Sequence, residues 1–77
     1  STDAQAYYNY IIDSADETES SISSSIVGQN SAESTMISST YNGFMDITYI
    51  DNTIIIAIAY DSNKQTEVIE FMNSLGY

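Results

Sequence analysis

The sequence contains no cysteine, no histidine and no arginine, and its 77 residues include one basic side chain, Lys64. Without cysteine no disulfide can form, and without histidine or cysteine the usual ligands of a structural zinc site are missing. These absences exclude the two supports on which many small domains depend. We therefore expect a fold of marginal stability, which buries only about 60% of the surface of its unfolded chain.

The same absences remove most catalytic chemistry, because no histidine can shuttle protons near neutral pH and no cysteine can form a reactive thiolate. A serine nucleophile would depend on a carboxylate or on Lys64, which falls in the first turn of an expected surface helix. No glycine-rich phosphate loop is present, and so small a domain offers paired carboxylates no obvious cleft. We expect a protein that is not an enzyme, with no catalytic residue, no cofactor and no metal site.

Two further classes are disfavoured. No apolar run approaches the roughly 20 residues of a transmembrane helix, so no membrane span is expected. Direct binding to DNA or RNA would need several Lys and Arg side chains for the phosphates, and only Lys64 is available.

What the chain has in excess is negative charge. Eleven Asp and Glu residues face one basic residue, and the formal net charge is -10 at pH 7. Repulsion among like charges destabilises a compact state, so we expect the excess of negative charge to serve a function. The most direct explanation is that the chain binds a basic protein partner.

The first third of the chain has the pattern of an amphipathic helix. Thr2 followed by Gln5 forms a capping-box pattern, and Gly28 is expected to end the helical segment. Apolar residues recur at spacings of three, four and seven: Ala4, Tyr8, Ile11, Ala15, Ile22 and Ile26. The serines in the second half weaken this helix, because serine competes for backbone hydrogen bonds.

Asp51-Asn52 stands between two apolar runs and predicts a β-hairpin, because both residues tolerate the positive φ of a two-residue turn. In that register Tyr49 lies opposite Ile54. The face expected to form the core carries Met45, Ile47, Tyr49, Ile54, Ile56, Ile58 and Tyr60. The other face is expected to be partly covered and carries Phe44, Asp46, Thr48, Ile50, Thr53, Ile55, Ala57 and Ala59.

A third strand is expected over residues 34–41, because Asn42-Gly43 is a second hairpin-turn dipeptide. Ser31 and Glu33 also fit the start of a short helix, which keeps that alternative open for the same segment.

Helix signals return after the hairpin. Ser62 with Gln65 forms another capping box, and a stripe of Val68, Met72 and Leu75 is closed by Gly76. The order helix, two or three antiparallel strands, helix predicts a single α+β domain over residues 1–77. The simplest arrangement is a two-layer sandwich, with both helices on the isoleucine-rich face.

Four carboxylates lie within seven residues of the expected first helix, without a basic residue nearby: Asp13, Asp16, Glu17 and Glu19. On a helix their neighbours would be about 5 to 6 Å apart, a spacing similar to that of phosphates along a nucleic acid strand. This cluster is therefore the best candidate for binding a basic surface. The competing interpretation is a solvated face that keeps an isoleucine-rich domain soluble.

Seven tyrosines form the second unusual feature, and Tyr7, Tyr8 and Tyr10 crowd into four positions. Tyr8 falls on the apolar stripe, whereas Tyr7 and Tyr10 would lie to its sides. Tyrosine is favoured at protein interfaces, so Tyr7 and Tyr10 are candidate contact residues, with a place at the edge of the core as the equal alternative.

Residues 53–60, TIIIAIAY, are β-prone and uncharged, which makes an exposed strand edge prone to association. In a meander this strand lies at the sheet edge. We expect a homodimer that continues the sheet across two copies, a partner that adds there, or shielding by the first helix.

Two functions fit these observations. The first is a small acidic inhibitor that occupies the basic nucleic-acid-binding surface of an enzyme, as anti-CRISPR and anti-restriction proteins do, in the cytoplasm of an infected host. The second is a secreted or surface-displayed structural module that associates with itself through its sheet. The richness in Ser, Thr, Asn and Tyr and the start at Ser1, without an initiator Met, favour the second.

Overall fold

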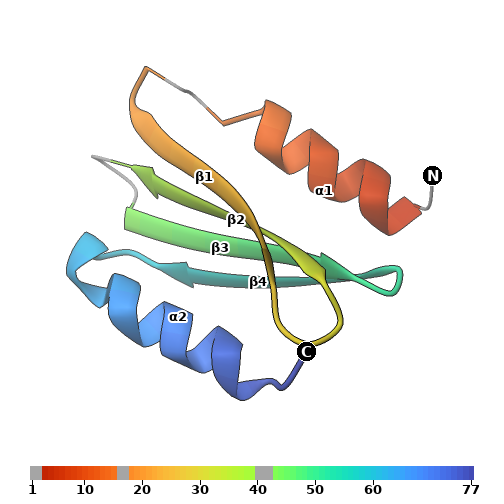
Figure 1. Ribbon diagram of the computed structural model, residues 1–77. Coiled ribbons are helices and arrows are strands. Elements are labelled where there is room, and N and C mark those ends of the chain that lie inside the picture. Colours follow the sequence, from red (N-terminus) through yellow and green to blue (C-terminus); the bar gives the residue numbers. More distant parts are fainter. Residues whose placement is uncertain (1–2, 16–17, 40–42) are drawn as a thin grey trace.

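The computed structural model describes residues 3–15, 18–39 and 43–77, in which two α-helices flank a four-stranded antiparallel sheet (Figure 1). In chain order the elements are α1 (Asp3–Asp13), β1 (Ser20–Val27), β2 (Ala32–Ser39), β3 (Gly43–Ile50), β4 (Thr53–Ala59), the 3-10 turn η1 (Ser62–Lys64) and α2 (Gln65–Ser74). The strands lie side by side in that order. This confirms the predicted α+β class, with four strands in the meander.

The first helix is shorter than predicted. It ends at Asp13, and the segment expected to continue it is β1, so the predicted extension to Gly28 is wrong. Ile22 and Ile26 are four residues apart, a spacing that matches one face of a helix and also one face of a strand. Serine is a poor helix former and isoleucine is β-branched, so the local preference favours a strand once β2 offers a partner.

The β3–β4 hairpin forms as predicted. Asp51 and Asn52 both have positive φ, 49° and 58°, as a two-residue type I′ turn requires. The predicted register is confirmed, with Tyr49 opposite Ile54. The third predicted strand is also present as β2, which begins at Ala32. The end of the segment expected for this strand, residues 40–41, and Asn42 of the predicted turn lie outside the described residues.

The two helices occupy opposite faces of the sheet rather than sharing the isoleucine-rich face (Figure 1). α2 packs on the face of Phe44, where Val68 and Met72 complete a buried cluster. Partly buried side chains surround it: Met36, Ile55, Ala57, Ala59, Ile69 and Tyr77. Ala57 and Ala59 are small side chains on β4, and both pack against this cluster.

α1 covers the isoleucine-rich face only in part. Ile47, on β3, is completely buried, whereas Ile56 and Ile58 of β4 are 41% and 49% exposed. The face predicted to be the core is therefore half open. The helix is 11 residues long and is anchored by its one buried residue, Tyr8, over β2 and β3, so its cover does not extend fully over the edge strand. Neither described helix has the length and hydropathy needed to cross a membrane.

Candidate protein-interaction surface

The predicted acidic cluster does not lie on one helix face. Asp13 is the last residue of α1, and Glu19 immediately precedes β1; both are exposed. The helix closes between them, where the Ser14 hydroxyl donates a hydrogen bond of 2.7 Å to the carbonyl oxygen of Tyr10. Asp16 and Glu17 lie outside the described residues. The helix expected to carry the whole cluster therefore ends at Asp13, and each expected pair of neighbours includes Asp16 or Glu17; Asp13 and Glu19 are both at the surface.

The predicted contact residues Tyr7 and Tyr10 are exposed, at 53% and 66% of their surface. Their rings stack with centroids 6.4 Å apart and an angle of 25° between the planes. Two aromatic rings thus form a continuous exposed surface on α1.

Tyr8, between them in sequence, faces the sheet. Its hydroxyl shares a hydrogen bond of 2.7 Å with Thr35 Oγ1, which shares another of 2.8 Å with Ser24 Oγ. Burial raises the pKa of Tyr8, the hydrogen bond to Thr35 opposes this rise, and the negative charges of Glu33 and Asp46 add to it. Tyr8 therefore fixes α1 on the sheet and leaves its two neighbours outside.

β4 is an edge strand, because it pairs with β3 on one side and with no described strand on the other. In an antiparallel ladder, only every second residue exchanges hydrogen bonds with the neighbouring strand. The two-residue turn makes Ile50 and Thr53 such a pair, and the pairs alternate from there. The backbone N–H and C=O groups of Ile54, Ile56 and Ile58 therefore point toward the open edge.

Apolar side chains gather beside this edge. We call Tyr7, Tyr10, Ile56, Ile58 and Tyr60 the edge surface; all five side chains are more than 40% exposed, and Tyr60 reaches 89%. Tyr10, Ile58 and Tyr60 line one cavity of about 550 Å³ between α1 and the sheet. Side chains from α1 and from the edge strand thus belong to one continuous surface.

The cavity itself is mainly apolar and extends under the second half of α1. Its apolar lining includes Tyr10, Ile11, Ile37, Met45, Ile58 and Tyr60. Serines and the Glu19 side chain supply its polar part, and none of the described lining residues is basic. Such a cavity suits an apolar group, and it lacks a cation that could bind an anionic one.

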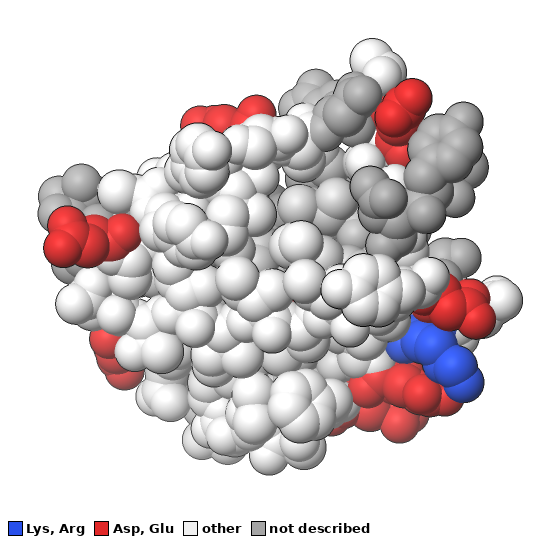
Figure 2. Space-filling model, turned by 180° about the vertical axis from the view of Figure 1, so that it is seen from behind, with Lys and Arg blue, Asp and Glu red and all other residues white. Residues whose placement is uncertain are grey.

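The charges lie around the edge surface rather than on it. Figure 2 views the molecule from the β4 side, with α1 above and α2 below. A broad area without charged side chains fills the middle of this view, and acidic side chains lie at its margin. An apolar centre with a polar rim is the usual anatomy of a protein interface.

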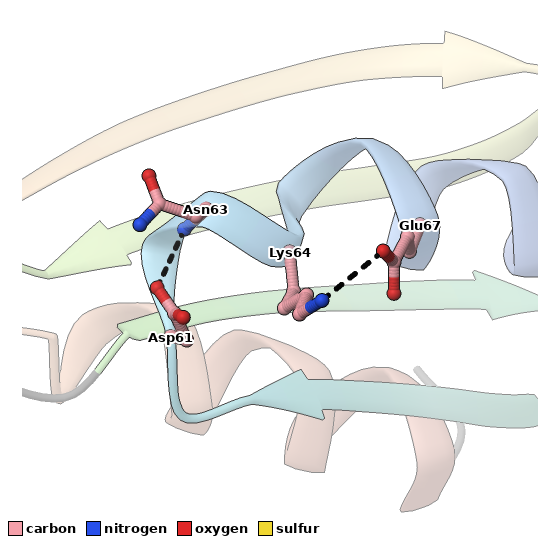
Figure 3. A network of polar contacts seen from close by, with 4 residues as sticks. All are labelled: Asp61, Asn63, Lys64 and Glu67. Atoms are coloured by element: carbon pink, nitrogen blue, oxygen red, sulfur yellow. Dashed lines mark hydrogen bonds and ion pairs between the residues drawn. The ribbon is translucent and has the colours of Figure 1, made fainter.

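Lys64 does little to offset this negative margin. Its Nζ lies 3.4 Å from Glu67 Oε1, and both side chains are exposed (Figure 3). Lys64 also occupies the position before α2, without a side-chain cap. The side chain of Ser62, on which the predicted capping box with Gln65 depends, lies outside the described residues. Instead, the Asp61 carboxylate accepts a hydrogen bond of 2.9 Å from the backbone N–H of Asn63 (Figure 3).

Asp46 is the buried carboxylate of the described residues, and its surroundings are structural. It is 2% exposed and accepts hydrogen bonds from the hydroxyls of Ser34, at 3.1 Å, and Thr48, at 3.0 Å. These donors offset part of the cost of burying the carboxylate. Among the described residues no group of three His, Cys, Asp or Glu side chains could hold a metal ion.

Sequence reasoning selected Tyr7 and Tyr10 as candidate contact residues and placed residues 53–60 at the sheet edge, but it wrongly assigned Ile56, Ile58 and Tyr60 to the core. Their exposure depends on the placement of α1, which no local pattern specifies. No protein family model, curated protein or solved structure matches the chain.

Proposed function

We propose that this protein is a non-enzymatic inhibitor that occupies a basic surface of its partner, of the kind that normally holds nucleic acid. The observation that carries this proposal is the charge. The net charge is -10, and the one basic side chain is already paired with a carboxylate. Such a molecule is attracted to a basic groove and competes there with DNA or RNA, as anti-CRISPR and anti-restriction proteins do.

The edge surface supports the proposal with a place for contact. Its apolar centre would supply the buried part of an interface, and Tyr7 and Tyr10 would be its aromatic anchors. The acidic residues Asp13 and Glu19, together with Asp16 and Glu17, would guide the approach and form contacts with Lys and Arg of the partner.

The experiment is an inhibition assay with a panel of purified restriction nucleases and RNA-guided nucleases. We expect inhibition of at least one enzyme, competition with its nucleic acid and weakening of inhibition by salt, because salt screens contacts between exposed charges. If no enzyme is inhibited, or if added salt and added nucleic acid leave inhibition unchanged, the proposal is wrong.

Two variants with equal net charge locate the contact. In the first, Asp13→Asn, Asp16→Asn, Glu17→Gln and Glu19→Gln are combined. In the control, Asp3→Asn, Glu33→Gln, Asp51→Asn and Asp61→Asn remove four exposed charges elsewhere. Loss of inhibition in the first variant alone assigns the contact to the predicted cluster, whereas equal loss in both assigns the effect to net charge.

The second candidate function is a surface-displayed module that associates with itself. The open backbone of β4, with exposed isoleucines beside it, favours this function. Analytical ultracentrifugation tests it: a dimer or polymer whose assembly is blocked by Ile56→Lys supports self-association, and a monomer at millimolar protein concentration contradicts it.

A further inference from the structure

We infer that the β4 edge binds an extended segment of the partner as an added strand, in which apolar residues alternate with Lys or Arg. The inference rests on the proposed function and specifies how the partner would be held. Three features of the described residues support it: the open backbone of β4, the exposed side chains on one of its faces, and the charge at the margin.

The backbone supplies the first feature. Ile54, Ile56 and Ile58 each direct one N–H and one C=O away from β3, at the regular spacing that an incoming strand can pair with. Addition of a strand to an open sheet edge is a common mode of peptide recognition. β4 has no proline and no charged side chain, two features with which proteins usually block such an edge.

The other edge of the sheet is less suited to this role. Five of the eight residues of β1 are serine, whereas β4 consists of one threonine, two alanines and four isoleucines. A strand added to β1 would therefore bury little apolar surface. The two edge strands thus differ in composition, and an added strand would bury more apolar surface at β4 than at β1.

The side chains supply the second feature. A strand added to β4 directs alternate side chains to the two faces of the sheet. On the α1 face they would lie beside Ile56 and Ile58, and Ile58 also lines the cavity under α1. Apolar residues of the partner suit these positions, because they would cover side chains that are now 41% and 49% exposed.

The negative charge of the chain is the third feature. It favours a basic segment of the partner at the β4 edge over a second copy of this chain. On the other face, the intervening side chains of an added strand would point toward the side of α2, which carries exposed Glu67 and Glu70. Lys or Arg of the partner at these positions would be attracted to the carboxylates of Glu67 and Glu70. A second copy would instead bring another ten net negative charges to the same margin.

The test uses a synthetic peptide with blocked ends that alternates lysine with leucine over about nine residues, long enough to pair along β4. Its affinity for the whole chain is measured by fluorescence anisotropy at low salt. A peptide with glutamate in place of lysine tests the charge. A third peptide, methylated at the backbone nitrogens that would face β4, tests the hydrogen bonds. We expect each of these two changes to weaken binding by at least about tenfold.

Two variants test the position with the same change of charge. Ile56→Lys places a lysine on β4, and Ile26→Lys places one at an exposed isoleucine of the opposite edge strand, β1. Loss of peptide affinity by at least about tenfold for Ile56→Lys, with less than about twofold for Ile26→Lys, is expected. Circular dichroism establishes that both variants are folded.

Three results would overturn the inference. The methylated peptide binds as well as its parent; both lysine variants bind alike; or sedimentation of the free chain shows a dimer that Ile56→Lys dissociates, which assigns the edge to a second copy. Failure of the proposed function is distinguishable, because then the unchanged chain inhibits no nuclease, whatever the peptide does. If a nuclease is inhibited equally by the unchanged chain and by Ile56→Lys, the function stands and strand addition is wrong.

Discussion

Replacement of Met72 by alanine tests the placement of α2 on the face of Phe44. Met72 is 1% exposed and packs with Phe44 and Val68. Truncation of a buried side chain of this size costs about 2 to 4 kcal/mol, through lost burial and the cavity left behind. A domain of 77 residues has a total free energy of unfolding of about 4 to 12 kcal/mol, so the loss would be a large fraction of it.

The next residue of the same helix is a matched control. Phe71 is 56% exposed, so Phe71→Ala should lower the free energy of unfolding by less than about 1 kcal/mol. Alanine is also the better helix former, which offsets part of that loss. Urea titration followed by circular dichroism measures both variants. If Phe71→Ala is as destabilising as Met72→Ala, α2 does not face the sheet through Val68 and Met72, and the reasoning is refuted.

Other predictions concern the anchor of α1, two glycines and the lone basic residue. Tyr8→Phe removes the hydrogen bond to Thr35 and should lower the free energy of unfolding by about 1 to 2 kcal/mol in urea, whereas the exposed Tyr10→Phe should change it by less than about 0.5 kcal/mol. Because burial raises the pKa of Tyr8, its contribution to the free energy of unfolding is complete below pH 10 and is lost as the pH rises through the raised pKa. Tyr8→Phe should therefore reduce the loss of stability at alkaline pH in thermal melts, and equal losses in the variant and the unchanged chain would contradict this prediction. Gly28→Ala would place a residue with a Cβ at a φ of 77°, where that Cβ would overlap the carbonyl oxygen of Tyr77. Gly76 has a similar φ of 80°, but a Cβ there would meet open space, so Gly76→Ala should cost about 1 kcal/mol for the backbone conformation alone. Gly28→Ala should therefore destabilise at least twice as much, and similar urea midpoints for the two variants would contradict the contact with Tyr77. Lys64→Gln should change the free energy of unfolding by less than about 0.5 kcal/mol, since its ion pair with Glu67 is exposed, and a larger loss in the same titration would give that pair a structural role.

Local chemistry was sufficient to predict the hairpin. Asp51 and Asn52 accept positive φ, and the flanking residues alternate, so turn and register follow from neighbours in the chain. The same kind of evidence failed at Ile22 and Ile26, whose spacing of four fits a helix and a strand equally well. There the pairing with β2 decides, and pairing is a property of the whole sheet.

The layers were harder to predict than the elements. Both faces of the β3–β4 hairpin carry apolar residues, so hydrophobic pattern alone does not assign α2 to the side of Phe44 and Ala57. The exposed residues of the candidate site likewise depend on which part of the sheet a helix covers. Tyr7 and Tyr10 could be selected from their crowding in sequence, but the exposure of Ile56 and Ile58 follows from the position of α1.

Amide hydrogen exchange along β4 tests most directly whether this edge is the open binding surface. In the free chain we expect Ile54, Ile56 and Ile58 to exchange faster than Ile55 and Ala57, whose N–H groups face β3. When the alternating lysine peptide is added, the three fast amides should become protected and the alternation should disappear. Uniform protection in the dilute free chain, or fast exchange that persists with saturating peptide, would contradict the account.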